Sequence, residues 1–277
     1  MIAHRGSSER HPDNSWAAFE AALVEGADAI ECDVQATRDG VLVIVHDLVI
    51  AGRLVAESSA AESAAGMDGV VIFGDLLDWA EHVDIDLLVE VKEPDATAAV
   101  AAAVAASAWR DRIVVGSFHA PALAAVKGAT PHVRTSFMIG SVIAAEDLVR
   151  LAAAYRLDGV HLCWESRSAL PHRLVDRAGI DRLRRAGLAI TLWHEEREDE
   201  LQALVALEPD AICTNTPSVL RRIVDAHCPR GGREHRGGAP ALEVERPTKI
   251  AQSADQKEPW SSKHRIAATH ADDKEES

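Results

Sequence analysis

Short β-rich segments alternate with longer segments of helical period as far as Ala226, and this alternation restricts the fold more than any other feature. The 277 residues suffice for one α/β barrel without a second large domain. Eight strands, nearly each followed by a helix, predict an α/β fold of the (β/α)8 TIM-barrel type. The strand candidates are centred on Ile2–His4, Ala29–Val34, Leu87–Val91, Ile113–Gly116, Thr135–Ile139, Gly159–Leu162, Ala189–Trp193 and Ala211–Cys213. An open doubly wound sheet is less compatible, because its usual Gly-rich turn is missing after the first strand.

A further strand interrupts the alternation. Val41–Val45 follows the second strand with no room for a helix, and Asp39-Gly40 between them is a strong hairpin signal. An even-length loop, which we expect, places His46 on the face that carries Glu31 and Asp33, whereas a three-residue loop turns it away. The barrel is therefore predicted to have an extra β-hairpin strand after strand 2.

The composition changes near Cys228. Residues 229–277 are rich in Gly, Pro, Ser and charged side chains, and large apolar residues are sparse there. Such a segment buries too little apolar surface to offset the entropy lost on ordering. We expect a barrel domain over residues 1–228 and a disordered tail over residues 229–277.

Charge and apolar patterning exclude several classes of partner. Lys and Arg total 29 against 44 Asp and Glu, a net charge of −15 that argues against nucleic acid as a partner. No signal-peptide pattern and no run of 18 apolar residues is visible, so we expect a soluble, cytoplasmic protein without stable membrane anchoring. The sequence does not indicate an oligomeric state.

Three carboxylates occupy positions where barrel strands normally carry Val, Ile or Leu. Glu31 and Asp33 share one strand face, and Glu90 stands beside Lys92 at the end of the next barrel strand. Clustered carboxylates repel one another unless a cation lies between them, and hard oxygen ligands suit Mg²⁺ or Ca²⁺. Two alternatives remain open, a solvated strand end without a ligand and a structural salt-bridged layer.

Other polar and aromatic residues lie at the carboxyl ends of the predicted strands, where barrel enzymes have their active sites. His4 and Arg5 leave the first strand, and Trp193 ends the seventh. His46 joins them through the hairpin. These residues form part of an ordered series of motifs that runs through the sequence as HRG (4–6), PDNS (12–15), GAD (26–28), ECDV (31–34), TRDG (37–40), HD (46–47), EVK (90–92), GSF (116–118), LW (192–193) and TNTP (214–217).

The series resembles the glycerophosphodiester phosphodiesterase family over roughly residues 1–225. The resemblance implies a TIM barrel that hydrolyses a small glycerophosphodiester to glycerol 3-phosphate and an alcohol, with a divalent cation as cofactor. It also implies the following roles: His4 and His46 as catalytic acid and base, Glu31, Asp33 and Glu90 as metal ligands, Arg5 and Lys92 as phosphate-binding residues, and Trp193 in the substrate pocket.

Some positions depart from the family pattern. Asp13 stands where Glu is usual, Asn215 where Asp is usual, and His194 where Thr commonly follows the Trp. The segment 48–71 is short, so the resemblance does not define the alcohol. Two other functions stay open: a lysophospholipase D-like activity on lysophospholipids, and a catalytically inactive barrel that serves as a binding module.

Overall fold

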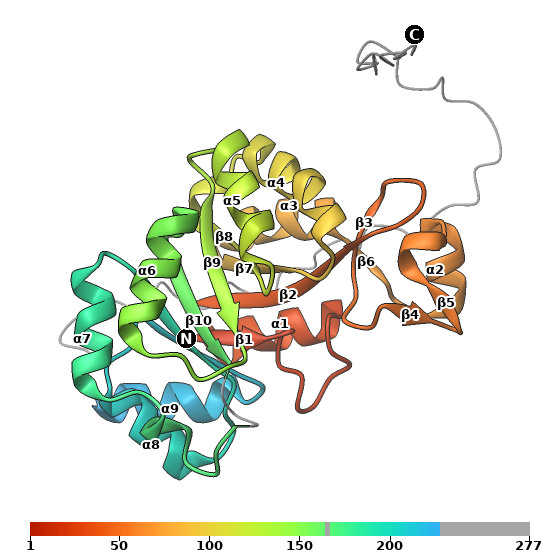
Figure 1. The fold of residues 1–277 in the computed structure, drawn as a ribbon. Helices are drawn as coiled ribbons and strands as arrows, with labels where there is room; N and C mark the ends of the chain where they lie inside the picture. The colour runs from red at the N-terminus through yellow and green to blue at the C-terminus, as the bar shows by residue number, and fades with distance from the viewer. Residues whose placement is uncertain (164–166, 228–277) are drawn as a thin grey trace, which may run out of the picture. The chain divides into compact units, whose positions relative to one another are not determined.

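The computed structural model describes residues 1–163 and 167–227, and these form a closed parallel barrel (Figure 1). The strands pair in the order β1-β12-β11-β10-β9-β8-β7-β2, and β2 pairs with β1 to close the ring. The predicted barrel is confirmed. The strands are β1 (Ile2–His4), β2 (Ala29–Ala36), β7 (Asp86–Val91), β8 (Ile113–Ser117), β9 (Arg134–Ile139), β10 (Gly159–Cys163), β11 (Ala189–Trp193) and β12 (Ala211–Thr214).

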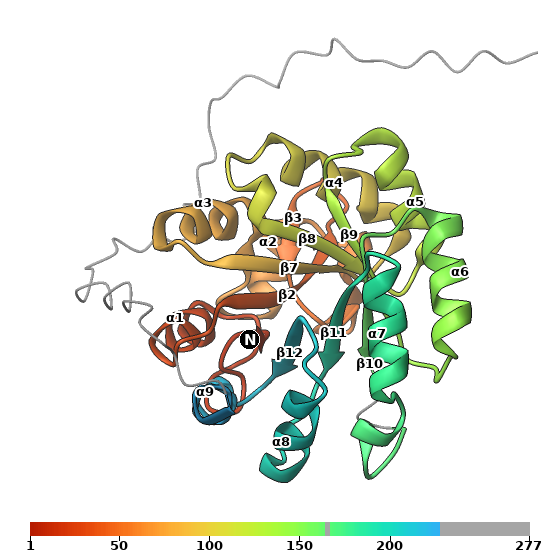
Figure 2. The ribbon, with the colours of Figure 1, turned by 90° about the vertical axis from the view of Figure 1, so that its left-hand side faces the viewer.

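Helices cover the outside of the barrel (Figure 2). Alternate strand residues such as Val89 and Val115 pack against them in the main core, because side chains along a strand alternate between its two faces. The inward positions hold a smaller cluster that contains Ile2, Leu88 and Cys213. The covering helices are α1 (Trp16–Val24), α3 (Phe73–Val83), α4 (Thr97–Ala106), α5 (Ala120–Ala129), α6 (Ala145–Tyr155), α7 (Arg177–Arg185), α8 (Glu198–Ala206) and α9 (Pro217–His227), with 3₁₀ turns η2 (Pro94–Ala96), η3 (Arg110–Arg112) and η4 (Pro171–Arg173) between some of them.

The predicted hairpin is present, but its register differs from the expected one. β3 (Leu42–Ile44) runs antiparallel to β2 and pairs Ala36 with Leu42. Thr37 N donates to Val41 O at 2.9 Å, which leaves a three-residue loop that ends in Gly40 at a φ of 79°. A turn followed by a left-handed Gly is the usual three-residue hairpin loop. The even-length loop was therefore wrong, because Asp39-Gly40 ends a longer turn instead of forming a two-residue one.

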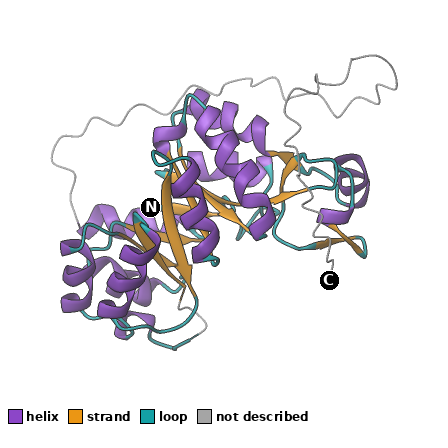
Figure 3. Ribbon diagram, turned by 45° about the horizontal axis from the view of Figure 1, so that its top comes forward, coloured by secondary structure: helices purple, strands orange, loops and turns teal. Residues whose placement is uncertain are grey.

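The segment after β3 forms a small lobe beside the barrel (Figures 1 and 3). Val45, Ile50 and Val55 of this segment form an apolar cluster with Val43 of β3. A capping box at Ser59 begins its helix. The elements, which the sequence did not predict, are β4 (Val49–Ile50), β5 (Arg53–Leu54), η1 (Val55–Glu57), α2 (Ala60–Gly66) and β6 (Val71–Ile72), the last of which pairs with β3.

The predicted disordered tail, residues 229–277, lies outside the described residues. Within residues 1–163 and 167–227, no helix has the length and apolar character needed to cross a membrane.

Candidate active site

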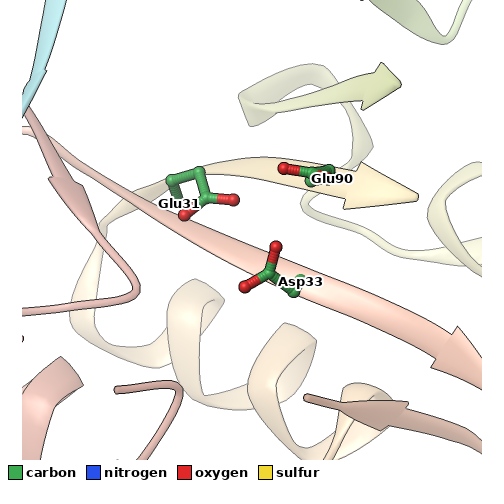
Figure 4. Close-up of side chains that lie close together, drawn as sticks. All are labelled: Glu31, Asp33 and Glu90. Atoms are coloured by element: carbon green, nitrogen blue, oxygen red, sulfur yellow. The ribbon is translucent and has the colours of Figure 1, made fainter. Parts of the chain in front are cut away.

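The predicted metal ligands meet at the carboxyl ends of two neighbouring strands. Strand pairing places Asp33 of β2 directly opposite Glu90 of β7, and Glu31 lies two residues earlier on the same face as Asp33. Each of the three offers a carboxylate oxygen within 4.8 Å of the others (Figure 4). All three side chains are buried.

One oxygen of each carboxylate has no hydrogen bond from the described residues: Glu31 Oε1, Asp33 Oδ1 and Glu90 Oε2. Buried polar atoms are normally hydrogen-bonded, because an unpaired one lowers the stability of the fold by about 1–3 kcal/mol. The loss is larger when the atom belongs to a charged group. Burial, and then the charges of Asp33 and Glu90, raise the pKa of Glu31 well above its usual value. Burial and Asp33 likewise raise the pKa of Glu90. A divalent cation would relieve both problems, so the cluster fits the predicted metal.

A tight turn after β1 brings Arg5 to these carboxylates. Gly6 has a φ of 84°, and a Cβ there would lie 2.5 Å from the backbone carbon of Ala18, so only Gly fits. Arg5 N donates to Glu31 Oε2 at 3.1 Å, and its Nε lies 3.1 Å from Asp33 Oδ2. The HRG motif thus fixes a guanidinium at the edge of the cluster.

Lys92 and Asn14 complete the surroundings of the carboxylates. Lys92 Nζ donates to Glu90 Oε1 at 2.7 Å and lies 3.4 Å from Asp33 Oδ1. Burial alone would lower the pKa of Lys92, but Asp33 and Glu90 outweigh burial and raise it. Asn14, at a φ of 53°, donates to Asp33 Oδ2 at 2.8 Å. The position of Asn14 in the PDNS motif could have indicated this hydrogen bond to a predicted metal ligand, but no role was predicted for Asn14 from the sequence.

His4 is buried at the end of β1 with its two ring nitrogens in different surroundings. Nδ1 lies 2.7 Å from Asn215 Oδ1, whereas Nε2 lies 3.8 Å from Glu31 Oε2 and has no hydrogen bond from the described residues. Burial, then Arg5 and His194, lower the pKa of His4 well below its usual value. Asn215 also accepts a hydrogen bond from Ser8 Oγ at 2.8 Å, so its oxygen is an acceptor toward His4 Nδ1–H.

His46 reaches the site by a route other than the one expected. The observed register of β3 would turn it away from Glu31 and Asp33, but β3 ends at Ile44 and the chain bends. The Gln35 side chain holds the bend by donating to the carbonyls of Val45 and Asp47 at 3.0 and 2.9 Å. This role of Gln35 had no recognisable sequence signal.

His46 lines an open pocket of about 340 Å³ together with Glu90 and Lys92. Its side chain is 38% exposed, and Nδ1 lies 2.9 Å from Asp47 Oδ1. One histidine of the predicted pair is therefore buried beside Glu31, and the other faces solvent beside Glu90.

Trp193 lies at the end of β11 and contacts the site through aromatic side chains. Its ring centroid is 5.2 Å from His4 and 5.9 Å from Phe118. His194 stacks on His4 with centroids 4.7 Å apart, a contact that its position in the sequence did not predict. His161 lies 5.2 Å from Trp193 and is fully buried in the barrel, and burial lowers its pKa to about 3.

Proteins of known sequence or known structure resemble this chain over most of its length. A Caldanaerobacter subterraneus glycerophosphodiester phosphodiesterase is 26% identical over 245 residues, covering 81% of this chain and 97% of that protein. A glycerophosphodiester phosphodiesterase structure from Parabacteroides distasonis matches with a TM-score of 0.68 and 21% identity, covering 82% of this chain and 96% of that one. A phosphodiesterase structure from Oleispira antarctica, in complex with the product sn-glycerol-3-phosphate, matches with a TM-score of 0.69 and 20% identity. The match covers 81% of this chain and 96% of that one.

The profile of the glycerophosphoryl diester phosphodiesterase family matches residues 4–81 and 56–219, which together span most of the chain and every residue of the site described above. The chain is therefore a member of the glycerophosphoryl diester phosphodiesterase family.

Proposed function

We propose that this protein hydrolyses glycerophosphodiesters to glycerol 3-phosphate and an alcohol, using a divalent cation and two histidines. The observation that carries the proposal is the set of three buried carboxylate oxygens on Glu31, Asp33 and Glu90 that accept no hydrogen bond from the described residues. Family membership supports the reaction class, and the glycerol 3-phosphate bound in the Oleispira structure supports the product.

The charges of the site suit a phosphodiester. Three carboxylates, one divalent cation, Arg5 and Lys92 sum to one positive charge, and the proton that His46 carries as the acid adds another, so the site attracts the single negative charge of a phosphodiester. The cation would be held by Glu31, Asp33 and Glu90, and it would supply positive charge to the phosphoryl oxygens. Arg5 and Lys92 contact Asp33, and their positively charged side chains would bind and orient the phosphate next to the cation.

We assign different roles to the two histidines. Because His4 Nδ1–H donates to Asn215, the lone pair of His4 lies on Nε2, and its lowered pKa keeps the ring neutral at pH 7. His4 then accepts a proton from the attacking hydroxyl group, which belongs to water or to the glycerol moiety. If the glycerol hydroxyl attacks, the product is a cyclic phosphate, which water then opens to glycerol 3-phosphate. His46, in the open pocket, donates a proton to the leaving alkoxide. The alcohol leaves on the side of His46.

A second candidate function is a lysophospholipase D-like activity, which keeps this chemistry and changes the substrate. The side chains of Leu48 and Phe118 line the pocket and are 43% and 42% exposed. The acyl chain of a lysophospholipid is attached to the glycerol moiety, so these apolar side chains favour an acylated substrate only if the glycerol, and not the leaving alcohol, faces them.

The test is hydrolysis of glycerophosphocholine, followed by enzymatic detection of glycerol 3-phosphate, with Mg²⁺ or Ca²⁺ and with EDTA. Release of glycerol 3-phosphate that EDTA abolishes is expected. Lysophosphatidylcholine, assayed in parallel for choline release, separates the two candidates. Hydrolysis of neither substrate would contradict the proposed function, and full activity in EDTA would contradict the metal.

A further inference from the structure

Two positions that depart from the family pattern, His194 and Asn215, meet at His4. His4 ends β1, Asn215 follows β12 and His194 follows β11, and these three strands are neighbours in the barrel. Asn215 contacts an edge of the His4 imidazole, with its Oδ1 2.7 Å from Nδ1. His194 covers a face of the same imidazole, with ring centroids 4.7 Å apart and an angle of 19°. Both departures therefore act on one side chain.

Glu196 connects these two contacts. Its Oε1 lies 2.8 Å from His194 Nδ1 and accepts a hydrogen bond from Asn215 N at 3.3 Å. A carboxylate only accepts hydrogen bonds, so His194 carries a proton on Nδ1. One oxygen atom thus binds both residues that contact the edge and the face of the His4 ring.

The segment that follows β11 is fixed to the barrel. The hydroxyl of Thr214, the last residue of β12, donates to the Glu195 carbonyl at 2.7 Å and ties this segment to the neighbouring strand. Trp193, the last residue of β11, contacts the His4 ring as well, with centroids 5.2 Å apart and an angle of 73°. The buried His4 ring is therefore enclosed by side chains whose own backbone is held in place.

We propose that His194, Glu196 and Asn215 form a positioning network that holds the His4 ring with Nε2 directed at the reacting hydroxyl group. This inference rests on the proposed function, in which His4 accepts the proton, and adds positioning residues to it. Asn215 fixes the tautomer, the His194 ring prevents tilting, and Glu196 fixes both. A proton acceptor works only within hydrogen-bond distance of the proton, so a misplaced ring lowers kcat more than it weakens substrate binding.

The test measures kcat and KM for glycerophosphocholine in single and double variants. His194→Thr removes the stacked ring and Glu196→Ala removes the shared acceptor, and each should lower kcat about 10-fold and change KM less than about 2-fold. Glu196→Gln should keep kcat within about 2-fold of the wild type, because an amide oxygen still accepts both hydrogen bonds. The two side chains are 25% and 37% exposed, so these replacements should leave the fold intact.

The same substitutions in a His4→Ala background separate positioning from a general structural effect. Because the network acts through His4, each substitution should change the residual kcat of that variant less than about 2-fold. The same fold loss with and without the His4 imidazole would overturn the positioning role.

His172→Thr is the matched control, because His172 Nδ1 lies 2.7 Å from Glu200 Oε2 in a pair of the same kind. Among the described residues it makes no ring contact with His4, and it should keep the kcat of the wild type. Full kcat in His194→Thr, equal losses in the two Glu196 variants, or an equal loss in His172→Thr would overturn the network while leaving the phosphodiesterase in place. A wild type that hydrolyses no glycerophosphodiester would overturn the proposed function and the network with it.

Discussion

His161 should make the stability of the barrel depend on pH in a range where exposed carboxylates no longer titrate. Its imidazole is fully buried, and both ring nitrogens lack a hydrogen bond from the described residues. Burial lowers its pKa to about 3 from the ordinary 6.5. Between these values the unfolded chain binds a proton that the folded chain does not, so the free energy of unfolding falls as the pH falls below about 6.5.

The size of this effect follows from the two pKa values. Proton uptake by an unfolded-state imidazole with a pKa of about 6.5, integrated from pH 7 down to pH 5, costs the folded state about 2 kcal/mol. Any folded-state pKa below about 4 gives the same result, because the buried ring is then still neutral at pH 5. His161→Gln, which cannot titrate, should lose about 2 kcal/mol less than the wild type over this range.

The assay is urea unfolding of the wild type, His161→Gln and the control His132→Gln at pH 7 and pH 5, in EDTA. His132 is exposed in a turn, so its replacement should leave the pH dependence of the wild type almost intact. His4, whose pKa is lowered chiefly by burial and only in small part by His161, is present in all three proteins, so most of its contribution is common to them. If His161→Gln loses as much stability as the wild type between pH 7 and pH 5, the ring is protonated or solvated in the folded protein and the reasoning is wrong.

Other predictions concern the site and the chain ends. Glu31→Gln should abolish activity yet raise the melting temperature in EDTA by a few degrees, because it removes a repelled, buried carboxylate; a lower melting temperature in EDTA would argue against the metal cluster. His4→Ala and His46→Ala should each lower kcat by roughly 10²–10⁴-fold, and a nitrophenyl ester should restore much of the rate to the His46 variant alone, since a good leaving group needs no acid. Rescue of the His4 variant instead would reverse the assigned roles. Mg²⁺ should raise the melting temperature more at pH 8 than at pH 5, where the raised pKa values of Glu31 and Glu90 favour protonation over metal binding; an equal rise would contradict their role as ligands. Removing residues 229–277 should leave turnover unchanged, because β12 and α9 complete the barrel before residue 228, and loss of most activity would show that the domain boundary is wrong.

The sequence predicted the barrel well because each of its strands carries a local signal that the tertiary structure does not override. The nearly continuous burial along β7 and β8 appears in the sequence as short apolar runs, Leu87–Val89 and Ile113–Val115, between segments of helical period. The cluster of Glu31, Asp33 and Glu90 was predictable for the same reason, since parallel strands bring their carboxyl ends together.

The remaining parts depend on side-chain contacts between distant residues. The hairpin loop is three residues long because the Thr37 hydroxyl accepts a hydrogen bond from Val41 N at 3.1 Å and donates to its carbonyl, which no turn dipeptide indicates. Gln35 directs the bend at His46 through carbonyl groups ten and more residues away. The lobe was missed because β4, β5 and β6 are two residues long, too short for a periodic pattern.

The lobe carries His46 together with Asp47 and Leu48 of the pocket wall on a part of the chain with its own apolar cluster, whereas the three carboxylates and Lys92 belong to barrel strands or their ends. Insertions or deletions within residues 48–70 would therefore fall outside the barrel strands and outside Arg5 and Lys92. Under the proposed function, substrate range can diverge through this segment while Glu31, Asp33, Glu90 and Lys92 are inherited intact, and a chimera that exchanges the segment between relatives would show how much of the leaving-group preference it carries.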